Sequence, residues 1–360
     1  KEGKQAKRGR AEQRTAPDER RAHHLAPVGH IVLARDFRIA RRHETLLYKV
    51  NTPPFRLRRS PRQALRAKSS FESGDQLGHK PYMMEKADII IIGGGLVGLT
   101  QALALAKHGI SSHVVDRADP EAMLAHDFDG RTSAISSSSM KMFEAIGLGE
   151  ALEGKGCPIE QIWVSDGLKP GSLDFVPGAE DGYLGQMFEN RLIRRTLYEA
   201  AKASDAIHLH MPASILSKER DATGVTVTLD NGTTLSADLM VVAEGRQSTT
   251  REEAGIKIIH WQYNHSAMVG AVFHEKPHQN IAYEIFYPSG PFAVLPMLDS
   301  ADGRHRCAIV WSVDEADAPG YMKLSKRGYA AELEKAMGGL LGSVELAAPL
   351  SSYKLGFHHA

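Results

Sequence analysis

The sequence is poor in cysteine and lacks the short motifs of several enzyme classes. Its 360 residues include two cysteines, Cys157 and Cys307, which are too few and too far apart for a disulfide framework or a cysteine zinc site. The 17 histidines include adjacent pairs, but neither pair stands among further ligands at a zinc-like spacing, so we expect no metal site. The absence of a Gly-x-Ser-x-Gly elbow, a Walker loop and an internal repeat argues against hydrolases of that type, P-loop enzymes and repeat proteins.

Charge divides the chain into two unlike parts. Residues 1–82 contain 20 Lys and Arg against 8 Asp and Glu, and all 12 methionines lie from Met83 onward. Low hydrophobicity and high net charge are typical of disorder, so we interpret residues 1–83 as a basic disordered tail that is not native to the protein. A mitochondrial transit peptide is the second interpretation, and nonspecific attraction to nucleic acid is the third.

One uncharged run, Ile89–Ala106, reaches the lower length limit for a transmembrane helix. Four glycines at positions 93, 94, 95 and 98 would break such a helix, but they suit a strand that ends in a tight turn. We therefore predict a buried parallel strand at Ile89–Ile92, a helix that ends near residues 107–109, and a second strand at His113–Val115.

The order strand, G-x-G-x-x-G, helix, strand and acid predicts a dinucleotide-binding fold. Gly93 permits the turn, Gly95 lets the backbone approach a pyrophosphate, and Gly98 brings the helix close to the strand. The helix N-terminus then points at the phosphates, and Asp116 is placed to accept hydrogen bonds from ribose hydroxyls. The motif does not distinguish one dinucleotide from another.

Downstream of Asp116 the chain alternates between helical and strand-like segments. We predict helices at Ser137–Leu148 and Arg191–Ala203, and a fully buried strand at Leu239–Ala243 that leads into a second loop at the nucleotide. Further strands are expected at Gln161–Ser165, Ser172–Phe175, Ala213–Leu216, Val225–Leu229, Ala267–Phe273, Ala282–Tyr287, Phe292–Pro296 and Cys307–Val313. The fold class is therefore α/β, with a Rossmann-like parallel sheet and a separate antiparallel sheet that is a candidate substrate platform.

Several ordered motifs together resemble flavin-dependent aromatic-ring monooxygenases. They are GGGLVG with Asp116, DGRTSAIS (129–136), MFENR (187–191), VVAEGRQSTTRE (241–252) and GPFAVLPM (290–297). Within these para-hydroxybenzoate-hydroxylase-like flavoproteins, the set is most similar to the ubiquinone-biosynthesis hydroxylase family. The similarity runs from about Met84 to the end of the chain.

The resemblance implies an FAD-dependent monooxygenase that uses NADPH or NADH and O2 to hydroxylate a polyprenylated phenol. The residues it assigns to the cofactor are Gly93, Gly95, Gly98, Asp116, Arg131, Arg191 and Gly245. The first four would hold the ADP half of FAD, Arg131 would lie near the pyrophosphate, and Arg191 would reach the flavin side. Gly245 would keep the turn of a loop at the pyrophosphate, in which Glu244 stands where the family has Asp. Surface ion pairing is the alternative for both arginines, and no residue stands out as a catalytic base.

The resemblance also implies a division of the chain. Residues 84–156 and 188–257 would form the FAD-binding domain, and residues 157–187 and 258–350 the substrate domain. Residues 351–360 would begin a C-terminal FAD segment whose Gly-Asp motif follows in the family. We therefore expect the chain to be a fragment that by itself binds FAD weakly.

The expected partners are a lipophilic prenylated phenol, a membrane surface or other ubiquinone-pathway enzymes, and no nucleic acid. The expected location is the cytoplasm, with peripheral contact to the inner membrane, or the mitochondrial matrix if the tail is a transit peptide. A flavin-dependent reductase or dehydrogenase on the same fold and an inactive dinucleotide-binding fragment remain as alternatives, because fold alone does not fix chemistry.

Overall fold

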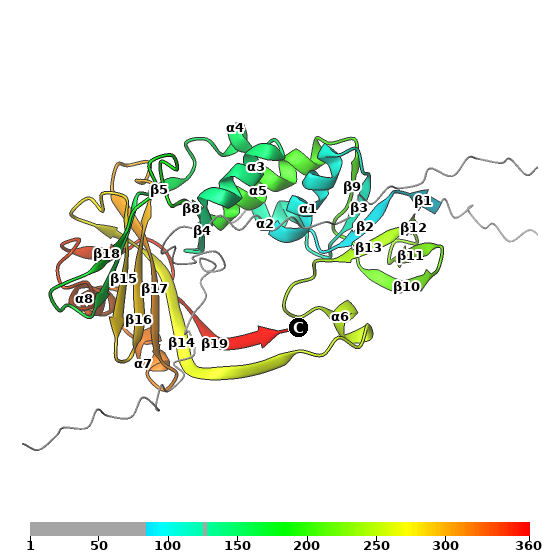
Figure 1. The fold of residues 1–360 in the computed structure, drawn as a ribbon. Helices are drawn as coiled ribbons and strands as arrows, with labels where there is room; N and C mark the ends of the chain where they lie inside the picture. The colour runs from blue at the N-terminus through cyan, green and yellow to red at the C-terminus, as the bar shows by residue number, and fades with distance from the viewer. Residues whose placement is uncertain (1–83, 125–127) are drawn as a thin grey trace, which may run out of the picture. The chain divides into compact units, whose positions relative to one another are not determined.

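The computed structural model describes residues 84–124 and 128–360 (Figure 1). The interpretation of residues 1–83 as a disordered, non-native tail falls outside the described residues. Within them, every helix is too short or too polar to cross a bilayer. The uncharged run at residues 89–106 is instead divided between a strand and a helix, as the glycine cluster predicted.

A parallel sheet forms the centre of the nucleotide-binding fold. Its strands are β2 (Ile89–Ile92), β3 (Ser112–Val115), β9 (Ile207–His210) and β13 (Leu239–Val242). They lie in the order β13-β2-β3-β9, so the first strand along the chain lies between the second and the last. This order creates a topological switch point between β2 and β13, where doubly wound folds bind their ligands.

Two layers cover the parallel sheet. On one face, apolar side chains of α1 (Leu96–Lys107) and α5 (Asn190–Lys202) pack with those of α3 (Ser137–Ala145) and α4 (Gly149–Leu152). On the other face lies a four-stranded sheet in the order β1-β12-β11-β10. Its strands are β1 (Met84–Lys86), β10 (Ile215–Asp221), β11 (Gly224–Leu229) and β12 (Thr234–Ala237). The short helix α2 (Pro120–Leu124) follows β3.

Three details of these layers correct the sequence-based expectations. The helix predicted at Ser137–Leu148 ends at Ala145, because the chain turns at Gly147 with a positive φ of 90°. The strand predicted at Ala213–Leu216 runs instead over Ile215–Asp221, where polar side chains face solvent. The strand β13 was expected to be fully buried, but it lies at the edge of its sheet with Leu239 and Val242 exposed.

A second, mainly antiparallel sheet forms the other large layer, as predicted. Its order is β18-β14-β17-β16-β15-β6-β7, with β19 paired to β14 and β6 running parallel to β15. The strands are β6 (Gln161–Asp166), β7 (Leu173–Phe175), β14 (Ile259–His274), β15 (Ile281–Tyr287), β16 (Gly290–Met297), β17 (His305–Asp314), β18 (Val344–Leu346) and β19 (Ser351–His359). The long strand β14 pairs with β17 along one edge and with β19 along the other (Figure 1).

The two faces of this sheet meet different elements. One face packs on α8 (Lys326–Met337) and α7 (Ala318–Met322), neither of which the sequence analysis predicted. The other face, which we call the inner face, carries Ala282, Ala293, Leu295 and Ala308. It packs against β5 (Cys157–Ile159) and β8 (Gly185–Glu189), which pair with β4 (Thr132–Ser136) in a three-stranded sheet.

A Gly98→Ala substitution is predicted to destabilise the fold, because its Cβ would lie 1.8 Å from the carbonyl oxygen of Gly93. Overpacking against backbone costs about 1–3 kcal/mol. Gly95→Ala is the matched control, since a Cβ there meets nothing within 4 Å. Thermal and urea unfolding of both variants check the prediction, and equal stability of the two would contradict it.

Candidate nucleotide-binding site

The glycine turn after β2 is shaped by close backbone contacts. Gly93 has a φ of 107°, and a Cβ on it would lie 2.4 Å from the carbonyl oxygen of Ala243 after β13. The Gly93 N–H donates to the carbonyl of Val115 at 2.8 Å, which fixes the turn to the end of β3. The roles that the sequence predicts for Gly93 and Gly98, a turn and a close helix–strand approach, agree with these contacts.

The N-terminus of α1 offers free hydrogen-bond donors. Gly95 is the N-cap residue, no side chain caps the helix, and its first turn contains no acid. The first N–H groups of a helix have no partner within it and carry a partial positive charge. Because a Cβ on Gly95 would meet nothing within 4 Å, the space in front of these donors is open. The arrangement fits a pyrophosphate bound to backbone N–H groups.

Asp116 is held in place at the end of β3. Its Oδ2 accepts a hydrogen bond from the Gly94 N–H at 2.7 Å, and its Oδ1 accepts one from the Ala118 N–H at 2.8 Å. A carboxylate has about four lone-pair positions. Asp116 can therefore orient the glycine turn and still accept hydrogen bonds from ribose hydroxyls.

The loop after β13 is organised by Glu244. Its Oε2 accepts hydrogen bonds from the Ser248 hydroxyl at 2.6 Å and from the Thr250 N–H at 3.1 Å. Burial acts to raise the pKa of Glu244, but these hydrogen bonds outweigh it and the pKa is lowered. Gly245 has a φ of 82°, which supports the predicted turn. Glu244 thus stabilises the loop and the start of α6 (Thr249–Glu253) from within, a role that the sequence left open.

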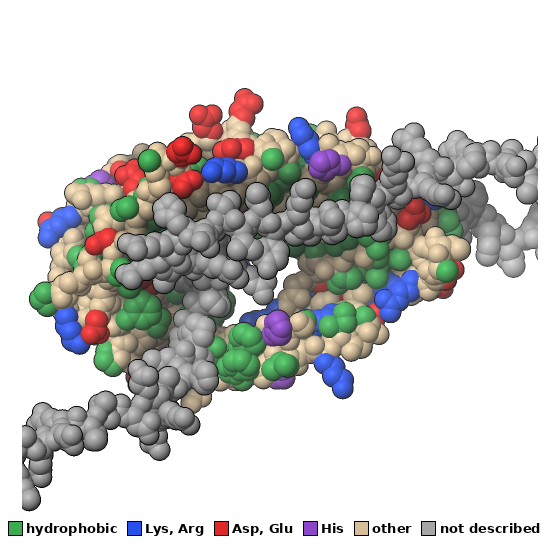
Figure 2. Space-filling model, in the orientation of Figure 1, with side chains coloured by type: hydrophobic (Ala, Val, Ile, Leu, Met, Phe, Trp, Pro, Cys, Tyr) green, Lys and Arg blue, Asp and Glu red, His purple; other side chains and the backbone are tan. Residues whose placement is uncertain are grey.

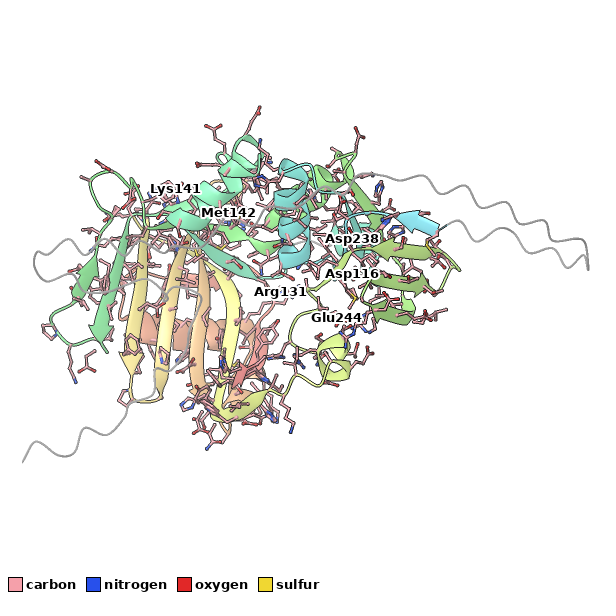
Figure 3. All side chains as sticks on the ribbon, turned by 45° about the vertical axis from the view of Figure 1, so that its right-hand side comes forward. Asp116, Arg131, Lys141, Met142, Asp238 and Glu244 are labelled. Atoms are coloured by element: carbon pink, nitrogen blue, oxygen red, sulfur yellow. The ribbon has the colours of Figure 1, made fainter. Side chains whose placement is uncertain are left out.

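The ends of β2 and β3, the start of β10 and the Glu244 loop surround one cavity of about 640 Å³, and Gly93 connects it to the glycine turn before α1. Such a volume lies within the range of roughly 300–1,000 Å³ that is usual for ligand sites. The cavity brings Gly93, Asp116 and Glu244 together, and Figure 3 labels the last two beside the parallel sheet. Its other lining residues are Ile92, Val115, Arg117, Ala213, Ser214, Ile215, Leu216, Lys218, Arg246, Gln247, Thr249 and Glu253. The cavity lies at the carboxyl ends of β2 and β3, the position that the fold predicts for a nucleotide.

The two arginines assigned to the cofactor do not line this cavity. Arg131 forms an ion pair with Asp129, with Nη2 and Oδ2 2.6 Å apart and both side chains exposed. This pair raises the pKa of Arg131. Arg191 lies 2.6 Å from the buried carboxylate of Glu189, which also binds Arg306 at 3.0 Å. Arg131 therefore forms a surface ion pair, whereas the ion pair of Arg191 is with a buried carboxylate.

Glu284 is a candidate functional residue that the sequence analysis missed. It lies on β15 directly opposite Val164 of β6 and Ala293 of β16, and therefore on the inner face of the antiparallel sheet. No hydrogen bond or ion pair to its carboxyl group is found among the described residues. Burial raises its pKa to about 7. Predicting from the sequence that this acid lies on an apolar face would have required the side-chain alternation and the register of β6, β15 and β16 together.

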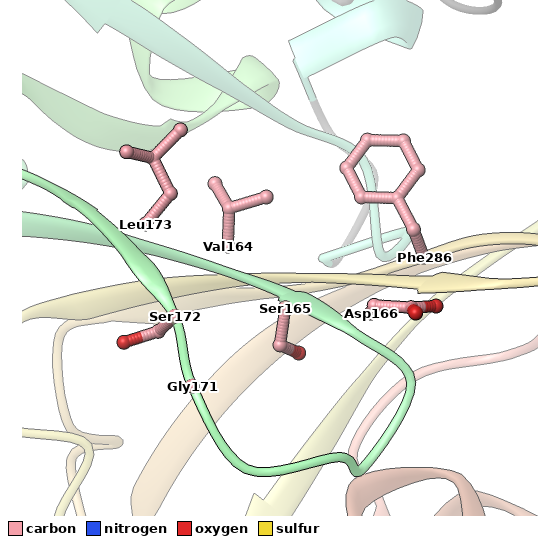
Figure 4. A pocket seen from close by; sticks show the side chains of 7 residues that line it. All are labelled: Val164, Ser165, Asp166, Gly171, Ser172, Leu173 and Phe286. Atoms are coloured by element: carbon pink, nitrogen blue, oxygen red, sulfur yellow. The ribbon is translucent and has the colours of Figure 1, made fainter. Parts of the chain in front are cut away.

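A separate hollow of about 460 Å³ lies at the β6–β7 edge of the same sheet (Figure 4). Leu173, Val164 and Phe286 point to one side of the sheet there, whereas Ser165 and Ser172 do not (Figure 4). Val164 also lies opposite Glu284. The hollow is therefore a neighbour of Glu284 and is distinct from the nucleotide cavity.

Comparison with known families supports this interpretation of the site. The family described as the FAD binding domain matches residues 86–348. Ubiquinone hydroxylase UbiL of Rhodospirillum rubrum is 42% identical over 269 residues, which cover 75% of this chain and 62% of that protein. The 3-demethoxyubiquinol 3-hydroxylase of Escherichia coli is 29% identical over 262 residues, which cover 72% of this chain and 66% of that protein. The matched part of the chain thus spans just under two thirds of each relative.

Solved structures share the fold at low sequence identity. PqsL of Pseudomonas aeruginosa, in complex with 2-aminobenzoylacetate, matches with a TM-score of 0.61 and 19% identity over 76% of this chain and 74% of its own. The flavin-dependent monooxygenase PieE, in complex with FAD and substrate, matches with a TM-score of 0.57 and 15% identity over 76% of this chain and 50% of its own. These matches confirm the predicted combination of a Rossmann-like parallel sheet and an antiparallel sheet.

A Gly95→Val substitution is predicted to abolish FAD binding while leaving the fold intact. The branched side chain would occupy the open space at the N-terminus of α1, but it would meet no protein atom near its Cβ. Gly320→Val is the control, because Gly320 is equally unobstructed and lies on α7. Fluorescence titration of FAD should show at least about a hundredfold loss of affinity, the equivalent of roughly 2.7 kcal/mol, in the first variant only. Normal FAD affinity of the Gly95 variant would exclude the site.

Glu284 predicts a specific pH dependence of stability. Its folded-state pKa of about 7 lies above the ordinary value of 4.5. As the pH rises between these values, the unfolded chain loses this proton while the folded chain keeps it, so the folded state loses stability. The loss amounts to at most about 3 kcal/mol and is complete above pH 7.

Glu284→Gln removes this pH-dependent cost. Relative to the unmodified chain, its free energy of unfolding should therefore increase between pH 4.5 and pH 8. Glu219→Gln, which changes an exposed glutamate on β10, serves as the control. Urea unfolding at several pH values makes the measurement, and parallel pH profiles of the Glu284 variant and the unmodified chain would refute the assignment.

Proposed function

Because the chain belongs to the family of FAD-binding domains, we propose that it forms the cofactor-binding part of an FAD-dependent monooxygenase. The proposed reaction is hydroxylation of the aromatic ring of a polyprenylated phenol in ubiquinone biosynthesis, with NADPH or NADH and O2. The observation that carries the proposal is the cavity in which the glycine turn, Asp116 and the Glu244 loop meet. The similarity to two ubiquinone hydroxylases supports the substrate class.

The cavity and the glycine turn that leads from it into α1 suit the ADP half of FAD. The free N–H groups at the start of α1 would bind the pyrophosphate, and Asp116 would accept hydrogen bonds from the ribose. Gly245 allows the Glu244 loop to approach from β13. Arg131 and Arg191 would join the cofactor only by exchanging their present partners, Asp129 and Glu189, for it. When bound, FAD supplies the redox chemistry between the nicotinamide and O2.

We propose that the inner face of the antiparallel sheet is the substrate surface. We also keep, as a proposal, the division into an FAD-binding domain and a substrate domain that was predicted from the sequence. Beside Glu284 this face carries Val164 and the exposed Phe286, which suits a ring that carries a prenyl chain (Figure 4). Glu284 is the one acid on β15, and its partly buried carboxyl group has a pKa near 7. Such a group is suited to accept the proton of a phenol hydroxyl and so activate the ring. We assign it this role.

A lipophilic substrate is expected to reach the enzyme from a membrane surface, to which the protein would bind peripherally. Apolar side chains are exposed on the arm formed by β14 and β19, among them Ile259, Trp261 and Tyr353. Figure 2 shows hydrophobic side chains gathered on this arm. Aromatic and aliphatic groups of this kind favour the membrane–water interface. The proposed location is therefore the cytoplasmic face of the inner membrane, or the matrix side if residues 1–83 are a transit peptide.

The test separates cofactor binding from catalysis. FAD is titrated into the 360-residue chain, and a protein of the relatives' full length that contains this chain is supplied with FAD, NADPH or NADH, ¹⁸O2 and a prenylated phenol in detergent. The proposal predicts yellow, FAD-loaded protein and a ring-hydroxylated product with one ¹⁸O atom. NADPH oxidation that reduces the substrate without inserting oxygen would instead identify a reductase or dehydrogenase. Absence of FAD binding in both proteins would identify a noncatalytic domain.

A further inference from the structure

Three potential metal ligands from two sheets converge away from the nucleotide cavity. They are Glu85 on β1, His113 on β3 and His210 on β9, and their ligand atoms lie within 4.8 Å of one another. His113 Nδ1 is 3.0 Å from His210 Nε2, and His210 Nε2 is 3.9 Å from Glu85 Oε2. Ligands bound tetrahedrally at about 2.0–2.1 Å from a zinc ion are separated by roughly 3.3 Å. Small side-chain rotations therefore suffice to close the three groups around one ion.

The strand arrangement explains the convergence. His113 lies opposite His208 in the β3–β9 pair, and His210 lies two residues further along the same face. The strand β1 belongs to the four-stranded sheet that covers this face of the parallel sheet. Glu85 therefore approaches the two histidines from the neighbouring sheet. The sequence analysis missed the group because its members are 28 and 97 residues apart, far from any local metal motif.

The surroundings of His113 leave room for a further partner. Its ring is 1% exposed, its Nδ1 lies 3.0 Å from His210 Nε2, and its Nε2 has no hydrogen-bond partner among the described residues. One of the two nitrogens that lie 3.0 Å apart donates to the other, so metal binding would displace the proton between them.

We propose that Glu85, His113 and His210 form a binding site for a divalent transition-metal ion of the zinc class. Two imidazoles and one carboxylate are common zinc ligands, and water would complete a tetrahedral shell. The ion would connect β1 to β3 and β9 and so tie the four-stranded sheet to the parallel sheet. This role is independent of the proposed flavin reaction, because none of the three residues lines the nucleotide cavity.

The test uses the whole 360-residue chain after removal of metals with EDTA. Co²⁺ is titrated in and followed by the visible absorption of its tetrahedral complex, and Zn²⁺ is then added to displace it. One equivalent should bind, and Zn²⁺ should raise the unfolding temperature because it stabilises only the folded state. Absence of tetrahedral absorption at one equivalent would overturn the proposal.

Variants identify the ligands. Glu85→Gln and His210→Gln should each weaken Co²⁺ binding at least tenfold and remove the stabilisation by Zn²⁺. His208→Gln is the matched control, since it removes an exposed histidine from the same face of β9 and should leave the binding unchanged. Glu85 is largely exposed, so its variant should fold normally without metal, which unfolding in EDTA checks. Binding that survives in both ligand variants would assign the ion to other histidines and overturn the proposal.

Discussion

The close approach of α1 to β2 is the constraint on which the nucleotide site depends. The carbonyl of Gly93 occupies the space that a side chain at Gly98 would need, and Ala243 occupies the space beside Gly93 itself. In the same turn, the Gly93 N–H donates a hydrogen bond to the carbonyl of Val115 in β3. Three parallel strands and one helix therefore meet at a single backbone turn, and their meeting point defines where a pyrophosphate can lie.

The acids around this turn have complementary roles. Asp116 fixes the turn from β3, and Glu244 fixes the loop after β13 through Ser248 and Thr250. Each uses hydrogen bonds to hold backbone in place before any ligand arrives, which reduces the ordering cost of binding. Farther along the chain, Glu189 joins Arg191 of α5 to Arg306 of the antiparallel sheet. The buried carboxylate of Glu189 thus connects α5 to the antiparallel sheet.

Local sequence patterns were sufficient to predict the nucleotide fold. The four isoleucines, the glycine spacing and Asp116 lie within one strand–helix–strand unit, so neighbouring residues carry the whole signal. The exposure of β13 could not be read in this way, because an apolar run looks the same in an edge strand and a central one. Arg131 and Arg191 pair with acids only two residues upstream, Asp129 and Glu189, so the sequence contained both partners but could not decide between ion pairing and a cofactor role.

Long-range pairing explains what else the sequence did not reveal. Glu284 becomes notable only when β6 and β16 place apolar residues on both sides of it. The group of Glu85, His113 and His210 arises only when two sheets stack. In both cases the chemistry depends on strand register, which periodicity within a single segment does not determine.

The central claim is that the backbone at the start of α1 binds the FAD pyrophosphate. Hydrogen–deuterium exchange of the chain with and without FAD tests this claim most directly, because it reports on the individual N–H groups that would bind the phosphates. The account predicts that FAD slows exchange most strongly at residues 94–97, with a smaller effect at residues 244–247 and none in α7 and α8. Protection confined to other segments, with unchanged exchange at residues 94–97 when FAD is bound, would contradict it.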